Sequence, residues 1–108
     1  MEKKINSIFW TEPSKKDLQN IYNFLATISE PLAFGIINKI VERVEILKSG
    51  FPEIGQREPL LKQRQNNYRY LLEGNYKIIY FIKNDQIIIS TVFDARQNPR
   101  KLKRQIKD

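Results

Sequence analysis

The sequence contains neither cysteine nor histidine. Without cysteine the protein has no disulfide, no thiolate nucleophile and no cysteine-held iron–sulfur cluster. Without histidine it has no Ser-His-Asp triad, no imidazole metal ligand and no side chain that ordinarily titrates near pH 7. We therefore expect no metal centre and no cofactor. Any acid–base chemistry has to rely on carboxylate, lysine, tyrosine or arginine side chains.

Long apolar runs are also missing, so no segment of the sequence is suited to span a bilayer. Residues 1–5 lack the apolar stretch of a secretory signal. The chain has 108 residues, of which 41% are hydrophobic and 29% are charged. This composition is typical of one globular domain, covering residues 1–108. Together these features predict a cytoplasmic protein that does not enter a membrane.

Negative charge is scarce, and the excess of positive charge is unevenly distributed. The chain holds 19 lysines and arginines against 12 acidic residues, a net charge of +7. Residues 95–108 form a basic C-terminal tail, with six lysines and arginines against one aspartate. A basic tail on a nearly balanced body indicates an acidic partner, either nucleic acid or an acidic protein segment. A solvated chain end would have the same composition.

The first half of the sequence predicts a short strand at 5–10 followed by two helices. Each helix begins with a hydroxyl residue suited to cap it and then Glu-Pro, at Thr11-Glu12-Pro13 and Ser29-Glu30-Pro31. Apolar residues then recur every three or four positions, which gives each helix one apolar face. Gly50 is placed to end the second helix. Because the connection is short, the two helices are expected to form an antiparallel hairpin.

The second half predicts a loop over 51–66 and then three strands at 67–73, 76–83 and 86–94. Gly74-Asn75 and Asn84-Asp85 are suited to the tight turns between them. The predicted fold class is α+β: an N-terminal strand, an antiparallel helical hairpin and a three-stranded antiparallel meander. The helices are expected to cover one face of the sheet and to leave the other more open.

Alternation along these strands assigns side chains to two faces. The more apolar face, expected against the helices, carries Arg69, Leu71, Tyr76, Ile78, Tyr80, Ile82, Ile87, Ile89 and Phe93. The second face carries Tyr68, Tyr70, Leu72, Lys77, Ile79, Phe81, Ser90, Val92 and Asp94. A β-bulge in either hairpin would exchange some of these positions. The mixed second face suits base stacking with phosphate neutralisation, a partner segment laid across it, or a plain half-exposed sheet.

Several short motifs occur in an order and spacing that is similar to a known family. They are Phe9-Trp10-Thr11-Glu12-Pro13-Ser14, Asp17-Leu18 with Ile21-Tyr22, and Leu47-Lys48-Ser49-Gly50-Phe51-Pro52 with Gly55-Gln56 and Glu58-Pro59. The most specific are Tyr68-Arg69-Tyr70-Leu71, Asn75-Tyr76-Lys77-Ile78-Ile79-Tyr80 and Val92-Phe93-Asp94-Ala95-Arg96-Gln97-Asn98-Pro99. Over residues 8–102 the chain resembles the RelE/ParE superfamily of bacterial type II toxin–antitoxin toxins, and more closely the ParE branch.

The resemblance implies a cytoplasmic, growth-inhibiting toxin that is neutralised by a cognate antitoxin wrapped along its helices and sheet. ParE-like members poison DNA gyrase, whereas RelE-like members are endoribonucleases that cleave messenger RNA on the ribosome. We expect a ParE-like toxin that binds DNA gyrase. A RelE-like endoribonuclease is the alternative, and a non-toxic basic module that binds nucleic acid is a third possibility. Whether the chain is an enzyme therefore depends on the branch.

The resemblance also assigns candidate site residues. It places Lys77 at the position of the family's strand arginine and Arg96 at that of the arginine near the end of the last strand. The lysines of the nuclease branch fall near Tyr70 and Leu72, or at Arg69 in a shifted register, and its C-terminal tyrosine has no counterpart. The candidates for phosphate chemistry are thus Lys77, Arg96 and Arg69. The candidates for target or nucleic-acid binding are Tyr68, Tyr70, Arg96, Arg100, Lys101 and Arg104.

Overall fold

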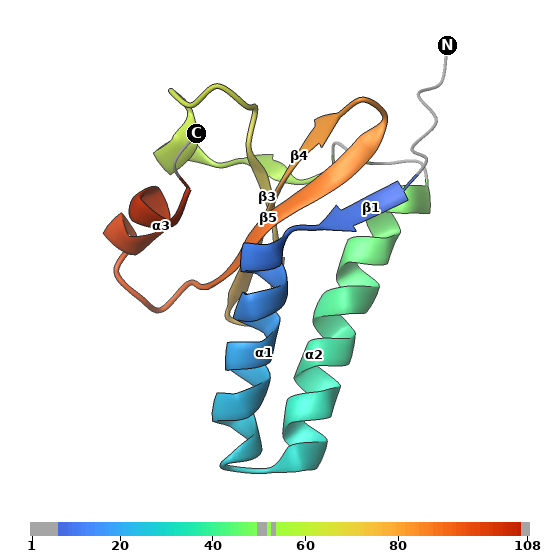
Figure 1. The fold of residues 1–108 in the computed structure, drawn as a ribbon, viewed down its shortest axis with the longest axis vertical. Coiled ribbons are helices and arrows are strands. Elements are labelled where there is room, and N and C mark those ends of the chain that lie inside the picture. Colours follow the sequence, from blue (N-terminus) through green and yellow to red (C-terminus); the bar gives the residue numbers. More distant parts are fainter. Residues whose placement is uncertain (1–6, 50–51, 53, 107–108) are drawn as a thin grey trace.

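A five-stranded mixed sheet of order β1-β5-β4-β3-β2 organises the fold in the computed structural model, which describes residues 7–49, 52 and 54–106 (Figure 1). The N-terminal strand pairs in parallel with β5, and the other neighbours are antiparallel. The strands are β1 (Ser7–Trp10), β2 (Gln56–Arg57), β3 (Arg69–Glu73), β4 (Tyr76–Lys83) and β5 (Gln86–Asp94). The predicted α+β class is confirmed, with a sheet larger than the expected meander.

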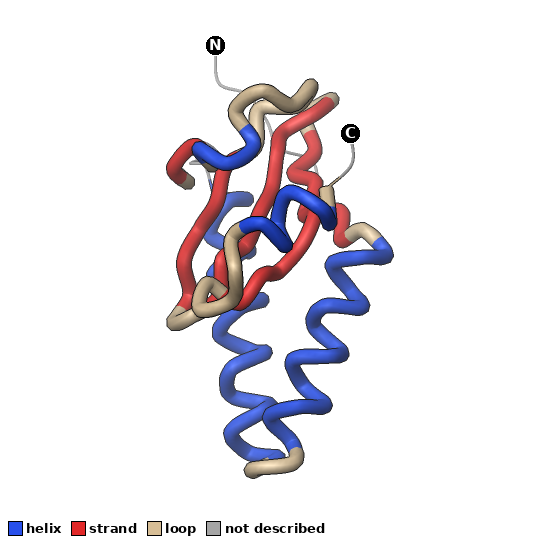
Figure 2. Tube along the Cα trace, turned by 90° about the vertical axis from the view of Figure 1, so that its left-hand side faces the viewer, coloured by secondary structure: helices blue, strands red, loops and turns tan. Residues whose placement is uncertain are grey.

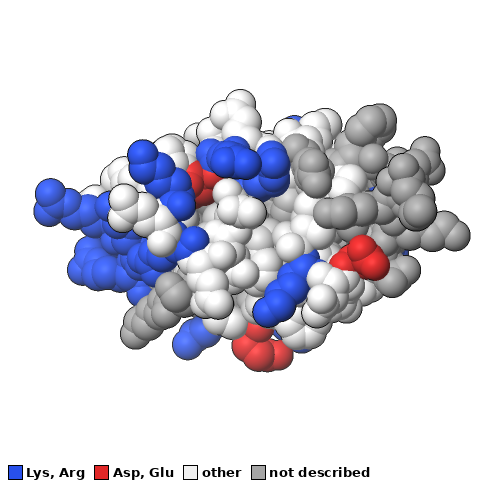
Figure 3. Space-filling model, turned by 90° about the horizontal axis from the view of Figure 1, so that it is seen from above, with Lys and Arg blue, Asp and Glu red and all other residues white. Residues whose placement is uncertain are grey.

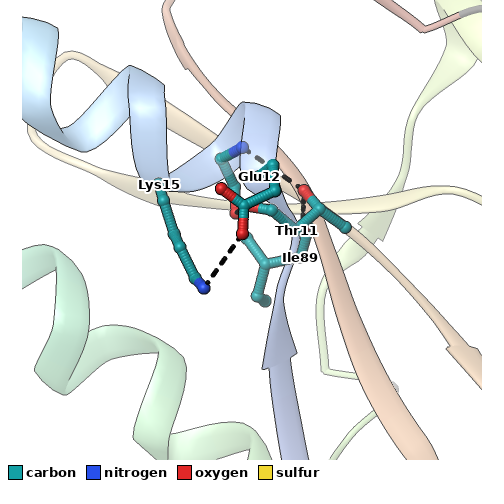
Figure 4. Close-up of polar contacts among 5 residues, drawn as sticks. Thr11, Glu12, Lys15 and Ile89 are labelled. Atoms are coloured by element: carbon teal, nitrogen blue, oxygen red, sulfur yellow. Dashed lines mark hydrogen bonds and ion pairs between the residues drawn. The ribbon is translucent and has the colours of Figure 1, made fainter.

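The two predicted helices begin where their capping residues stand. Helix α1 (Glu12–Ala26) is capped by Thr11 and α2 (Glu30–Glu45) by Ser29. Figure 4 shows the start of α1, where the Thr11 hydroxyl donates to the Ile89 carbonyl at 2.7 Å. The same oxygen accepts from the Ser14 amide at 3.3 Å. Thr11 therefore joins the first turn of the helix to the centre of β5 while it satisfies a free amide.

The helices form the expected antiparallel hairpin, and its far end extends beyond the sheet (Figures 1 and 2). A short 3-10 helix, η1 (Ile46–Ser49), continues α2, so the α-helix ends before the predicted stop at Gly50, which lies outside the described residues. The helices pack against one face of the sheet, and the side chains between them form the main core. Its buried members are Ile40, Val44, Leu47, Leu71, Tyr76, Ile78, Tyr80, Ile87, Ile89 and Val92.

A β-bulge in β5 changes which side chains share a face. Ile79 pairs with Thr91 and Tyr80 pairs with Ile89, so Ser90 has no partner across the ladder. Beyond the bulge the alternation is reversed. Val92 therefore joins the main core and Phe93 lies on the second face. The simple alternation predicted the opposite for these two residues, and the bulge, named above as the feature able to exchange them, is the physical reason.

The second face is partly covered: a cluster of buried residues lies on it, whereas Leu72 on the same face is 50% exposed. The 3-10 helix η2 (Pro59–Leu61) and a C-terminal helix, α3 (Arg100–Gln105), lie over it (Figure 1). The cluster beneath them consists of Leu61, Tyr68, Ile79, Phe93, Leu102 and Ile106. One expectation is thereby corrected, because residues 51–66 contain β2 and η2 rather than only a loop. The basic tail, whose structure the sequence left open, includes a packed helix.

The described part of the chain contains no helix that is long and apolar enough to cross a membrane.

Candidate partner-binding surfaces

Lys77, the first candidate for phosphate chemistry, forms an ion pair with Glu58. Its ammonium nitrogen lies 2.8 Å from Glu58 Oε2 and 4.4 Å from the centre of the Tyr70 ring. The Glu58 side chain is fully buried, and its other oxygen accepts from the Leu60 amide at 3.3 Å. The charge of Lys77 is therefore already used to neutralise a buried carboxylate.

Arg69 and Arg96 are held by other groups. Arg69 donates to the Gly55 carbonyl at 2.7 Å, which ties β3 to the segment before β2. Arg96 makes a bidentate contact with Asp94, at 3.0 Å and 2.8 Å. Hydrogen bonding by the Arg96 guanidinium lowers the pKa of the Asp94 carboxyl below its ordinary value. Each of the three candidate cations thus has an acceptor within the protein.

The three cations do not share one face of the sheet. Across the β3–β4 ladder Arg69 pairs with Tyr80, whereas Lys77 pairs with Leu72. Leu72 is three positions after Arg69 on the same strand, so Arg69 and Lys77 project from opposite faces. The arrangement does not offer all three positive charges to a single phosphate.

The two candidate tyrosines have different surroundings. Tyr68 is buried in the second cluster, and its ring packs edge-to-face on Phe81 with centroids 5.3 Å apart. Its ring is therefore not displayed as a stacking surface. Tyr70 is partly buried, donates from its hydroxyl to Gln56 at 2.9 Å and lies beneath the Lys77 ammonium.

The candidate cations of the tail lie on the exposed side of α3. Arg100, Lys101 and Arg104 are exposed, as is Lys103 between them, and among the described residues none of the four forms an ion pair. Figure 3 shows the corresponding concentration of positive charge on the side of the molecule where α3 lies. The residues that hold this helix in place, Leu102 and Ile106, were missed by the sequence analysis. These two apolar residues lie four positions apart, and cations surround them in the sequence. This pattern is the signal that indicates an amphipathic helix.

A second exposed surface is apolar and lies at the end of the helical hairpin. We define the hairpin tip as Phe24, Ile28, Leu32 and Phe34, whose exposed fractions are 63%, 66%, 43% and 55%. Phe34 also packs edge-to-face against Tyr22 at 5.2 Å. Ile28 continues the three- and four-residue spacing of apolar residues that predicted the first helix. It is exposed because α1 ends at Ala26, before the stripe does. Grouped exposed apolar side chains of this size are typical of a protein-binding surface.

Asp17 is a partly buried carboxylate between α1 and the bulged strand. It accepts from the Val92 amide at 2.9 Å and from the Thr91 hydroxyl. Burial raises the pKa of Asp17 above its ordinary value, against the opposing effect of these hydrogen bonds. The carboxylate satisfies one backbone amide and one hydroxyl beside the bulge, which is a structural role. Within the described residues no group of three or more acidic side chains is arranged to hold a metal ion.

The fold is shared with a chain of known structure. That structure is described as the chromosomal ParDE TA system from P. aeruginosa. The match has a TM-score of 0.69 at 23% identity and covers 84% of this chain and 97% of the other. No curated protein is significantly similar to the chain in sequence.

The sequence itself identifies the family. Residues 8–99 match the family model for the ParE toxin of the type II toxin–antitoxin system parDE. The chain therefore belongs to the ParE toxin family, and the resemblance drawn from its motifs is confirmed.

Proposed function

We propose that the protein is a ParE toxin that acts in the cytoplasm by binding DNA gyrase and trapping it on cleaved DNA. Membership of the ParE family over residues 8–99 carries the proposal. The geometry supports a binding mode of action, because Lys77, Arg69 and Arg96 are engaged by internal acceptors and do not face one phosphate. RelE-like cleavage of messenger RNA needs such cations to stabilise the extra phosphate charge.

Gyrase trapping is tested with the purified chain, supercoiled plasmid, gyrase and ATP. After denaturation and protease treatment, a trapped enzyme leaves linear plasmid, and we expect its amount to rise with toxin concentration. The same preparation is added to ribosomes translating a defined message, whose cleavage is read by primer extension. Cleaved message together with unaffected gyrase would assign the chain to the nuclease function instead.

We further propose that an antitoxin of the ParD kind neutralises the toxin and covers the hairpin tip. Three of its side chains, Phe24, Ile28 and Phe34, are the most exposed of the described large hydrophobic residues, and covering them removes apolar surface from water. The partner tested is the protein encoded beside the toxin. We expect Phe24→Ser with Ile28→Ser to weaken its binding at least tenfold in calorimetry.

The matched control is Phe9→Ser, which removes an aromatic of similar exposure, 52%, from β1. This variant is expected to bind the antitoxin as the unaltered chain does. If both changes weaken binding equally, the hairpin tip has no special part in the contact. If neither does, the antitoxin lies elsewhere on the toxin.

A further inference from the structure

The basic segment that the sequence places at the C-terminus forms an ordered surface in the fold. Leu102 is fully buried and Ile106 nearly so, and both anchor α3 on the sheet. Arg64, from the turn after η2, donates to the carbonyls of Lys103, at 2.8 Å, and Ile106. It thereby satisfies carbonyl groups at the C-terminal end of α3 with a cation, the favourable sign there. The backbone that carries the exposed cations of α3 is consequently held against the sheet.

One of these cations, Lys103, lines a groove beside α3. We define the α3 basic surface as Lys62, Arg100, Lys101, Lys103 and Arg104. A groove of about 320 Å³ separates Lys62 and the 59–64 segment from Lys103. On a helix, residues three and four positions apart are neighbours, so Arg104 lies beside both Arg100 and Lys101, and Lys103 lies beside Arg100. Among the described residues none of the five is neutralised by an ion pair.

The chemistry of this surface favours phosphates over a protein partner. The described large hydrophobic residues that are exposed all lie outside α3 and residues 59–64. Protein–protein interfaces have an apolar centre, whereas protein–DNA interfaces are more polar and strongly positive. Neither segment contains an aromatic residue, and Tyr68 beneath them is buried. The surface thus lacks the rings on which single-stranded bases stack.

We propose that the α3 basic surface binds the phosphate backbone of duplex DNA without sequence preference. This inference does not depend on gyrase as the target, because it concerns binding of the chain to DNA alone. DNA binding by this surface would be additional to any contact that the toxin makes with a protein. The four cations of α3 are expected to neutralise about four phosphates, so the binding constant should fall about 150-fold between 50 and 200 mM salt.

The test measures fluorescence anisotropy of a labelled 20-base-pair duplex with the full-length chain over this salt range. The variant Lys101→Gln with Arg104→Gln removes two contacts and keeps good helix formers in α3. We expect it to bind more weakly at 50 mM salt and with a salt slope smaller by about 1.8, so that its binding constant falls only about 12-fold between 50 and 200 mM salt. A second pair, Arg100→Gln with Lys103→Gln, should behave alike.

The matched control, Lys39→Gln with Lys83→Gln, removes the same net charge from exposed positions on α2 and β4. It should retain nearly all affinity, and circular dichroism melting checks that each variant is folded. Equal losses in the control and α3 variants would show that net charge alone attracts DNA and overturn the proposal, as would unchanged binding by both α3 variants. Tighter binding of a single strand, or displacement of the duplex by polyglutamate at equal charge, would overturn it in favour of another partner.

Discussion

The ion pair between Lys77 and Glu58 allows a sharp test, because its two partners are buried to different degrees. Glu58 has no exposed side-chain area, whereas 21% of the Lys77 side chain is exposed. At their separation of 2.8 Å the attraction is about 6 kcal/mol with an effective dielectric constant of 20. Much of this offsets the cost of removing both charges from water. The net contribution of the ion pair to the free energy of unfolding is therefore small compared with the loss expected when one partner is removed.

Lys77→Met breaks the pair on the side that leaves a buried charge. Of its contacts among the described residues, the Glu58 side chain keeps the 3.3 Å hydrogen bond from the Leu60 amide and loses its counterion. We expect a loss of about 3 kcal/mol in the free energy of unfolding, the lower end of the range for such a change, because the partly exposed site admits water. For a domain of this size the melting temperature should fall by roughly 12 °C or more.

The assay is urea unfolding followed by the fluorescence of Trp10, the sole tryptophan, which packs against the main core. Lys83→Met, at an exposed position on the same strand, is the control and should change stability by less than about 0.5 kcal/mol. Adding Glu58→Gln to Lys77→Met removes the stranded charge and should restore most of the loss. The reasoning is refuted if Lys77→Met matches the control, or if the double variant is no more stable than Lys77→Met alone.

Three further substitutions test other contacts. Because burial raises the pKa of Asp17, the native state binds the proton of this carboxyl more tightly than the unfolded chain does. The contribution of Asp17 to stability therefore falls as pH rises from 3.8 through the raised pKa. In urea unfolding over a pH series, the free energy of unfolding of Asp17→Asn should rise relative to that of the unaltered chain in that pH window. Gly55→Ala places a carbon 2.7 Å from Tyr80 Cε1 and 2.8 Å from the Tyr70 carbonyl oxygen, so thermal melting should report a loss of about 1–3 kcal/mol. Leu102→Ala empties a fully buried position, at a cost of about 2 kcal/mol, and should speed tryptic cleavage within α3.

The parts of the fold that local chemistry determines could be predicted from the sequence. Thr11 and Ser29 cap their helices as their Glu-Pro neighbours indicate. Gly74 has a φ of +59° in the predicted turn, and Asn84 and Asp85 have φ values of 52° and 60° in the next one. Such turns require residues that tolerate positive φ, so a few adjacent residues are enough to predict where they lie. The strands on either side then follow from alternation.

The missed elements depend on contacts between distant segments. Strand β2 has only two residues, and its pairing with Tyr70 and Arg69 gives no periodicity in its own sequence. The bulge at Ser90 is an extra residue that only the partner strand reveals. Helix α3 has six residues, too few to be stable alone, so its existence depends on the buried positions of Leu102 and Ile106.

The candidate site shows the same division and explains why charge alone was a weak guide to chemistry. The residue types at Lys77, Arg69 and Arg96 suit phosphate binding, but each of these cations has an acceptor within the protein. Glu58 and Gly55 come from the region treated as a loop, whereas Asp94 lies two residues before Arg96 at the end of β5. A cation with an internal acceptor must give up that contact before it can bind a ligand. The cations of α3 have no described ion pair to lose. The positive charge available to a partner is therefore concentrated on the helix that sequence patterns alone treated as a tail.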